Sequence, residues 1–359
     1  KAPWLTWLRR CCSNSSHVFK RNPERAGKEF SMSVAECQKI ELHLHLEGAA
    51  PPHFIRRLAD EKNINLQGVF DPAGNYIFQN FEQFLRVYEA ATTVLKSPED
   101  FYRLTAEVLS QSAAQGVIYS ELFLSPYFCG GSDLGAWADY LAAIEQAALE
   151  TQRKTGIRSR GIVTCIRHFG PDLAKKAAYC AAETAGDYIV GFGMAGDELQ
   201  GKQGDFSYSF DMAREAQLQL TTHAGEWGGP ESVRQAVRDL NVARIGHGVQ
   251  VIEDPELVAE ITAREIVLEI CPGSNVALGV FPSLAKHPIQ KLRDAGVLIT
   301  VSTDDPPFFH TDMKQEYTNL AETFGWGAKD FLALNITAAQ AAFCDIETKQ
   351  ILLKALESA

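Results

Sequence analysis

Short apolar runs rich in β-branched residues alternate along most of the chain with longer segments in which apolar residues recur every three or four positions. A short apolar run bounded by turn residues is typical of a buried strand, and the longer spacing is typical of a helix with one packed face. The pattern predicts eight strands, at residues 39–46, 117–124, 161–166, 188–194, 218–223, 243–246, 266–271 and 297–302.

The spacing of these strands predicts an α/β fold, a (β/α)₈ TIM barrel. Most neighbours are separated by roughly 20 to 30 residues, which leaves room for one helix and two loops. The first connection is longer and predicts extra helices inserted after the first strand. Within this insertion an apolar helix face fits either core packing or a lid over an aromatic ligand; its members are Phe81, Phe84, Leu85 and Tyr88.

Composition narrows the class of partner. The 359 residues carry a formal net charge of -11, and 46% of them are hydrophobic. An acidic chain argues against a nucleic-acid or anionic-membrane surface and favours a small soluble ligand. The eight cysteines are scattered without CxxC pairs, which favours a reducing compartment and free thiols. We therefore expect a soluble cytoplasmic protein that binds neither nucleic acid nor membrane; the composition leaves its oligomeric state open.

The first 31 residues differ from the rest, with seven basic residues against two acidic ones. Because Met32 can be an original start, we interpret residues 1–31 as a leader, a targeting segment or an added extension without a catalytic role. Residues 32–359 are then expected to form a single barrel domain.

The first predicted strand contains two histidines on one face. Its sequence, Glu41-Leu42-His43-Leu44-His45-Leu46-Glu47, places polar and apolar side chains on opposite faces through the two-residue period of a strand. Leucines are then expected to pack outward against helices, with the histidines pointing into the barrel. A divalent metal is the simplest partner for two buried imidazoles, although an isolated HxH pair is more often structural.

Three later segments place further polar side chains at the ends of predicted strands, where barrel enzymes carry their catalytic groups. THAGE (222–226) offers His223 as a ligand and Glu226 as a group that handles protons. RIGHG (244–248) sets His247 between two glycines, which suits close approach to a ligand as well as a simple turn. In STDDP (302–306) the adjacent Asp304 and Asp305 fit solvated or capping carboxylates when taken alone.

Taken together, these segments predict one metal site, because strands one, five and eight would bring their side chains to the same end of the barrel. Two competing motifs fail. The GxGxxG of residues 191–196 is followed at once by Asp197 and Glu198, where a dinucleotide pyrophosphate would lie. The HLE of residues 45–47 lacks the PCxxC of cytidine deaminases, and no GxSxG supports a serine hydrolase.

The ordered set HLHLEGA (43–49), MAGDE (194–198), THAGE (222–226), RIGHG (244–248), CPGSN (271–275) and STDDP (302–306) resembles the adenosine deaminase family of the amidohydrolase superfamily. The resemblance runs from about residue 38 to the C-terminus. It implies one Zn²⁺ per chain, held by His43, His45, His223 and Asp304. Many amidohydrolases bridge two metals with a modified lysine at the end of the fourth strand. Residues 188–200 contain no lysine, so a second metal is not expected.

The same resemblance implies roles for other residues. Glu226 would be the proton shuttle and His247 the group that orients and activates the attacking water, while Asp305 would be the partner of purine N7. Substrate contacts would come from the backbone of Gly196, from Glu47 on the sugar side, and from an apolar lid formed by Phe81, Phe84, Leu85 and Tyr88.

Glu47 leaves the substrate open. Adenosine deaminases more usually have Asp at this position, and adenine deaminases of the family have Glu. The MAGDE segment and the lead-in to STDDP look more like the adenosine branch, so adenosine is the expected substrate, with 2'-deoxyadenosine beside it, and adenine is the alternative. A purine-binding protein without activity and a metal-dependent ester or amide hydrolase are more remote alternatives.

Overall fold

The computed structural model describes residues 36–358, so the predicted leader at 1–31 lies outside the described residues. Eight strands pair in parallel in the order β1 to β8, and the predicted (β/α)₈ barrel is confirmed. Their bounds are β1 Lys39–His45, β2 Val117–Leu124, β3 Arg158–Ile166, β4 Ile189–Ala195, β5 Gln219–Ala224, β6 Arg244–His247, β7 Val267–Ile270 and β8 Leu298–Val301.

One strand differs from its predicted start by more than one residue. β3 begins three residues before position 161, because Arg158, Ser159 and Arg160 pair with residues 119–121 of β2. These polar residues carry no apolar signal, yet their backbone groups complete the ladder.

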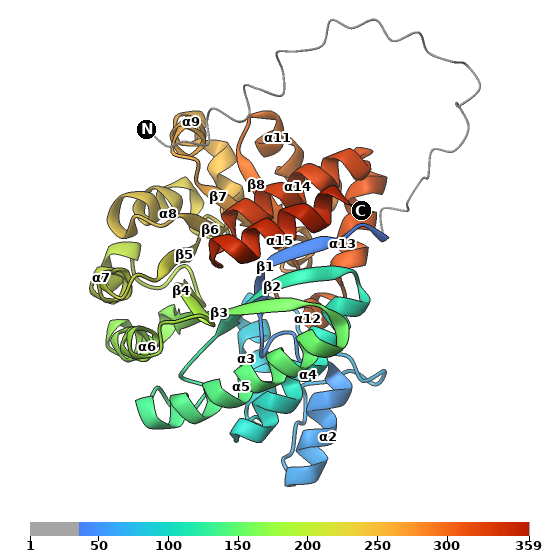
Figure 1. Cartoon of the computed structure of the whole chain (residues 1–359), viewed down its shortest axis with the longest axis vertical. Coiled ribbons are helices and arrows are strands. Elements are labelled where there is room, and N and C mark those ends of the chain that lie inside the picture. Colours follow the sequence, from blue (N-terminus) through green and yellow to red (C-terminus); the bar gives the residue numbers. More distant parts are fainter. Residues whose placement is uncertain (1–35, 359) are drawn as a thin grey trace, which may run out of the picture. The chain divides into compact units, whose positions relative to one another are not determined.

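Helices cover the outside of the barrel between successive strands (Figure 1). The α-helices along this ring are α5 Leu134–Thr155, α6 Pro171–Glu183, α7 Ser207–Glu215, α8 Gly229–Gln235, α9 Pro255–Ala263, α10 Pro272–Ala277 and α11 Ile289–Asp294. Short turns of 3₁₀ or π helix accompany them at η3 Arg167–Phe169, η4 Gln203–Phe206, η5 Ala236–Leu240, η6 Val249–Glu253 and η7 Leu284–Lys286. After β8 come α12 Pro306–Phe309, α13 Met313–Phe324, α14 Ala328–Ala341 and α15 Ile346–Glu357.

The predicted insertion after the first strand consists of α2 Pro52–Lys62, α3 Phe81–Thr92 and α4 Pro98–Ala114. Asn80 caps α3 by accepting a hydrogen bond from the backbone N–H of Gln83, and Ser97 caps α4 in the same way through Asp100. These caps define where the two helices begin, so the apolar face of α3 keeps a fixed rotation.

The two faces of β1 divide as the alternating pattern predicts. Ile40 and Leu42 are buried in an outer cluster with residues of α14 and α15, whereas His43 is fully buried on the inner side. The outer apolar contacts therefore fix the strand and hold the inward face in register.

The barrel closes between β8 and β1 through the segment that follows β8. The N–H of Asp304 donates to the carbonyl of His43 at 3.2 Å, and the N–H of His45 donates to the carbonyl of Asp304 at 3.1 Å. The Ser302 hydroxyl accepts from the N–H of Leu42 and of His43, each at 3.2 Å. The closure of the sheet thus places Asp304 between the two histidines of β1.

Within residues 36–358 no helix is long and apolar enough to cross a membrane. The cysteines of the described region are all buried, at Cys37, Cys129, Cys165, Cys180, Cys271 and Cys344, and those from Cys129 onward are free thiols.

Candidate functional site

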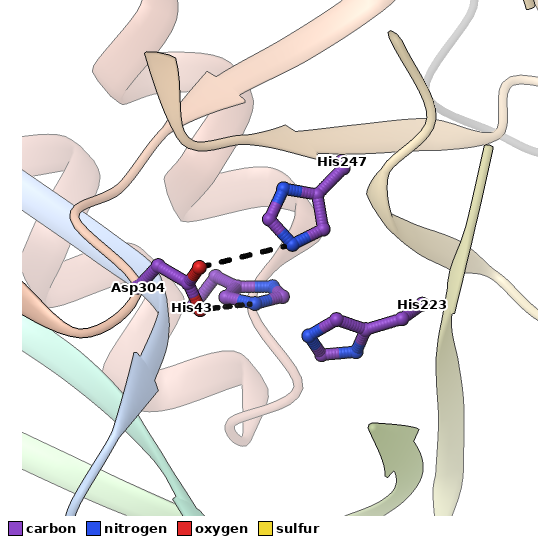
Figure 2. Close-up of side chains that lie close together, drawn as sticks. All are labelled: His43, His223, His247 and Asp304. Atoms are coloured by element: carbon purple, nitrogen blue, oxygen red, sulfur yellow. Dashed lines mark ion pairs between the residues drawn. The ribbon is translucent and has the colours of Figure 1, made fainter. Parts of the chain in front are cut away.

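Three imidazoles and a carboxylate converge in the centre of the barrel at the C-terminal ends of the strands (Figure 2). One ligand atom from each of His43, His223, His247 and Asp304 lies within 4.8 Å of the others. His45 extends the cluster, since its Nε2 lies 3.2 Å from Asp304 Oδ1 and 3.3 Å from His223 Nε2. The structure therefore brings together all four predicted ligands, with His247 beside them.

Unpartnered buried atoms show that this cluster fits a cation. His43 Nε2 and Asp304 Oδ1 are buried without a hydrogen-bond partner and lie 3.3 Å apart. Leaving such atoms unpaired is costly, and a divalent metal satisfies them together. Burial also lowers the pKa of His223 well below its usual range, which keeps this imidazole neutral, as a ligand must be.

Two of the histidines are held from behind through their other ring nitrogen. His43 Nδ1 lies 2.7 Å from Glu269 Oε2, and His223 Nδ1 lies 2.9 Å from the carbonyl of Met194. Because a carboxylate and a carbonyl only accept hydrogen bonds, each Nδ1 carries the proton and each Nε2 presents its lone pair to the centre. This is the arrangement that a metal requires of imidazole ligands.

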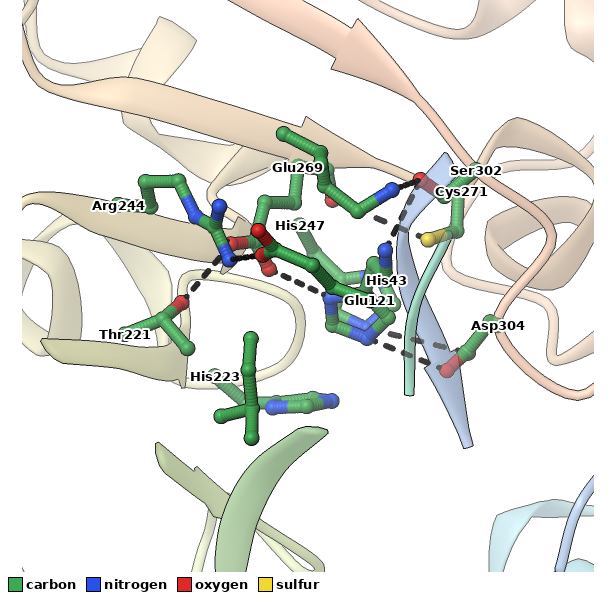
Figure 3. Close-up of polar contacts among 12 residues, drawn as sticks. His43, Glu121, Thr221, His223, Arg244, His247, Glu269, Cys271, Ser302 and Asp304 are labelled. Atoms are coloured by element: carbon green, nitrogen blue, oxygen red, sulfur yellow. Dashed lines mark hydrogen bonds and ion pairs between the residues drawn. The ribbon is translucent and has the colours of Figure 1, made fainter. Parts of the chain in front are cut away.

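A buried ion-pair network supports Glu269 (Figure 3). Arg244 Nε lies 2.6 Å from Glu269 Oε1, and the same guanidinium lies 2.6 Å from Glu121 Oε2. Burial acts to raise the pKa of Glu269, but Arg244 and His43 outweigh it and lower the pKa below its usual value. Glu269 is thus held as an anion deep in the barrel, where it orients His43.

The backbone is adapted to this crowding. A Cβ on Gly246 would lie 2.8 Å from the ring of His43, so only glycine on β6 leaves room for the histidine rings. His247 and Asp304 both adopt positive φ, at 60° and 69°, which is uncommon for non-glycine residues. The sequence predicts that the two glycines of RIGHG leave room for a ligand. In the structure, Gly246 leaves room for the rings of His43 and His223.

Glu226 lies beside the cluster on a loop that is tightly held. The carboxylate of Glu198 accepts hydrogen bonds of 2.5–3.1 Å from four consecutive backbone N–H groups, those of Gly225, Glu226, Trp227 and Gly228. Burial raises the pKa of Glu226 well above its usual range, and Asp304 and Glu198 raise it further. The raised pKa favours the protonated form of Glu226, which can donate a proton to a substrate.

His247 and Asp305 complete the polar group. His247 Nε2 lies 3.9 Å from Asp304, and burial lowers the pKa of His247 to about 3, so the imidazole is neutral. Burial raises the pKa of Asp305 well above its usual value, with Asp304 as the second cause. Gly48 makes room for Asp305, because a Cβ on Gly48 would lie 1.6 Å from Asp305 Oδ1.

A cavity opens above this polar floor. Its walls include the polar residues His45, His223, Glu226, His247, Asp304 and Asp305, the backbone of Gly196, and the four apolar residues of α3, Phe81, Phe84, Leu85 and Tyr88. Phe81 packs on Trp227 with ring centroids 5.5 Å apart, while Phe84 packs edge-on against Phe308 at the same distance. The face of α3 therefore joins the core and also lines the cavity, while its role as a lid over a ligand stays a prediction.

Glu47 is the one predicted substrate contact that does not line the cavity. It is only 4% exposed and accepts a hydrogen bond from the backbone N–H of Ser125. Its Oε1 is nevertheless buried without a partner, and burial raises its pKa to about 7. The carboxyl group lies close enough to Asp305 and Tyr88 to raise the pKa of both. The predicted contact of Glu47 with the sugar side of a substrate stays a prediction, and the structure places its carboxyl group beside Asp305 and Tyr88.

Several residues that build the site were given no role from the sequence. Glu269 could have been noticed, because it is the only charged residue in the apolar run 266–271. Asn275 and Ser274 lie in the CPGSN motif, and Ser274 donates to Asp304 Oδ2 at 2.7 Å. In the sequence, Glu198 serves only as an argument against a bound pyrophosphate. Its hydrogen-bond partners are backbone N–H groups, which a sequence does not reveal.

This chain is similar to known proteins in both sequence and fold. The family model described as adenosine deaminase matches residues 38–359. A protein named adenine deaminase from Rhizobium leguminosarum bv. trifolii is 44% identical over 320 residues, covering 89% of this chain and 98% of the relative.

Two solved structures share the fold over most of both chains. An adenine deaminase from Arthrobacter aurescens has a TM-score of 0.83 and 28% identity, covering 90% of this chain and 98% of its own. An amidohydrolase with bound zinc from Burkholderia ambifaria has a TM-score of 0.77 and 26% identity, covering 93% and 98%.

Replacing Glu269 tests its support of His43. Glu269→Gln keeps the shape of the side chain but removes the anion that fixes the His43 tautomer, so we expect the affinity for a divalent metal to fall about 10- to 100-fold. Competition with a chromophoric chelator measures this affinity, and Glu183→Gln, at the exposed end of α6, is the control. Equal metal affinities in the two variants would show that Glu269 does not support the metal site.

Proposed function

Because this chain belongs to the adenosine deaminase family and is an enzyme of hydrolytic deamination, we propose that its substrate is the free base adenine. Adenine and water would give hypoxanthine and ammonia. The observation that carries the proposal is the 44% identity, over nearly the full length of the relative, to a protein named adenine deaminase. Adenine, the alternative substrate of the sequence analysis, thus replaces adenosine, which the sequence alone favoured.

The chemistry of the cavity supports a flat, uncharged heterocycle. Apolar and aromatic side chains cover its upper wall, and carboxyl groups lie at its floor, where ring nitrogens need partners. No lysine or arginine is among the described residues that line it, so nothing there would balance a phosphate. His168 and Glu89, whose side chains lie 3.4 Å apart, join the η3 segment to α3 beside the cavity.

We propose zinc as the metal. Three imidazoles with one carboxylate form a nitrogen-rich set that suits Zn²⁺ better than Mg²⁺ or Ca²⁺, which prefer oxygen ligands. The predicted ligands His43, His45, His223 and Asp304 would hold it. Bound there, the metal supplies a Lewis acid that lowers the pKa of water from about 15.7 to about 7.

The chain's own residues would then direct the reaction. Asp305 would hold the purine through N7, and the apolar face of α3 would exclude bulk water. Glu226, protonated because it is buried, would donate its proton to N1 and make C6 electrophilic. His247 would orient the water that attacks C6. Glu226, having given its proton to N1, would take a proton from that water and deliver it to the departing amine.

Glu47 is proposed to contact the base rather than a sugar. Its free Oε1 needs a hydrogen-bond partner, and an adenine nitrogen beside Asp305 and Tyr88 would supply one. Because the carboxyl is buried and held by Ser125, a ribose would meet Tyr88 and its neighbours on α3 before it met Glu47. Adenosine remains the second candidate, favoured by the MAGDE segment that lines the cavity at Gly196.

A substrate panel tests the proposal directly. Zinc-loaded protein is given adenine, adenosine, 2'-deoxyadenosine and AMP in parallel, and ammonia release and ultraviolet absorbance are followed. We expect kcat/KM for adenine to exceed that for adenosine by about 100-fold, because a ribose must displace packed residues of α3. Preference for a nucleoside would return the assignment to adenosine, and silence on all four with metal bound would favour a binding protein.

The role of Glu47 has its own test in the same assay. Glu47→Asp withdraws the carboxyl by one methylene, so kcat/KM for adenine should fall about 10- to 200-fold while that for adenosine does not fall in proportion. Glu183→Asp is the matched control on an exposed helix end. An unchanged ratio of adenine to adenosine activity would show that Glu47 does not contact the base.

A further inference from the structure

Asn275 lies between the two groups that would handle protons in the reaction. Its Nδ2 is 3.2 Å from Glu226 Oε1 and 3.1 Å from His247 Nδ1. Asn275 is fully buried on α10, so its amide has no water to pair with. Whichever end of the amide faces Glu226 and His247 therefore determines how both are hydrogen bonded.

The direction of this amide is determined by a backbone group two steps away. The N–H of Ile289 donates to His287 Nδ1 at 3.1 Å, so Nδ1 of His287 is unprotonated. Its Nε2 then carries the proton and donates to Asn275 Oδ1 at 3.1 Å. Because Oδ1 is used as an acceptor, Nδ2 is the atom that faces Glu226 and His247 as a donor.

The chain of donors assigns the remaining protons. His247 Nδ1 accepts from Asn275, so in the neutral ring the proton is on Nε2, which points toward Asp304 and the cavity. Glu226 accepts through Oε1, which leaves its other oxygen to carry the acidic proton. His247 can then donate a hydrogen bond to the attacking water but has no lone pair facing the cavity with which to take a proton from it.

We propose that His287 and Asn275 are positioning residues that fix the Nε2–H tautomer of His247 and the oxygen of Glu226 that carries the proton. His247 then acts as a hydrogen-bond donor, and Glu226 is the group that moves protons. The inference rests on the proposed deamination for its effect on rate, whereas the tautomer itself is a property of the protein without substrate.

The surroundings of His287 favour this role. The ring is 3% exposed and packs edge-on against Phe281, with centroids 5.0 Å apart. Burial lowers its pKa to about 3, so it stays neutral and keeps one donor and one acceptor. His287 is not among the residues that line the cavity, and its two ring nitrogens are bonded to Asn275 and to the backbone of Ile289, so its effect on the site has to pass through Asn275.

Two substitutions at position 287 separate positioning from space filling. His287→Phe keeps a planar ring but removes the donor, so the Asn275 amide can turn over and present its oxygen to His247. His287→Gln retains an N–H donor within reach of Asn275 Oδ1. We expect kcat to fall about 10- to 100-fold in His287→Phe with KM and zinc content unchanged, and to recover most of the loss in His287→Gln.

The direct readout is the tautomer of His247, measured by ¹⁵N NMR of histidine-labelled, zinc-loaded protein. In the native protein Nε2 should be protonated and Nδ1 should be the bare nitrogen, and His287→Phe should shift population to the opposite tautomer. Asn275→Asp, which can only accept, should move the proton of His247 to Nδ1; it serves as the second variant if His287→Phe does not fold.

The results of these measurements decide whether His287 and Asn275 position His247 and Glu226. A native His247 protonated on Nδ1, or an unchanged tautomer in the variants, would overturn the proposal. Equal loss of kcat in His287→Phe and His287→Gln would also overturn it, because shape alone would then be at work. If the tautomer shifts as expected but the protein deaminates no purine, the positioning role stands and the proposed function fails.

Discussion

The structure depends on a cluster of histidines and a carboxylate buried at one end of a closed barrel. Neutral imidazoles and an aspartate without water are costly to bury, and the lone pairs of His43 and Asp304 have no partner among the described residues. A divalent cation turns that cost into binding energy. The barrel makes the cluster possible because its closing hydrogen bonds place Asp304 between the two histidines of β1.

The groups around the cluster share one task, which is to fix where hydrogens point. Glu269 and the carbonyl of Met194 hold the Nδ1–H of two histidines, so their Nε2 lone pairs face the centre. Glu198 gathers four backbone N–H groups and so fixes the loop of Glu226. Asn275 supplies donors to both Glu226 and His247. Reactive side chains in this site therefore need little rearrangement when a substrate arrives.

The sequence predicted the fold and which side chains meet inside the barrel, because both follow from the local pattern and the order of the strands. A strand's two-residue period assigns His43 and His45 to one face, and the barrel topology assigns His223 and Asp304 to the same end. The supporting residues could not be found in this way. Glu198 acts through backbone groups of a loop 27 to 30 residues away, and Glu269 reaches His43 across the barrel, 226 positions along the chain. Strand alternation could not show that the carboxyl group of Glu47 is buried close to Asp305 and Tyr88, because those two residues lie in other segments of the chain.

X-ray absorption at the zinc edge, combined with elemental analysis of the purified protein, tests the central claim most directly. The account predicts one zinc per chain with first-shell scattering from nitrogen and oxygen at about 2.0 to 2.1 Å and no metal–metal vector. Two metals per chain, a sulfur shell, or a protein that binds no zinc when it is supplied would contradict it.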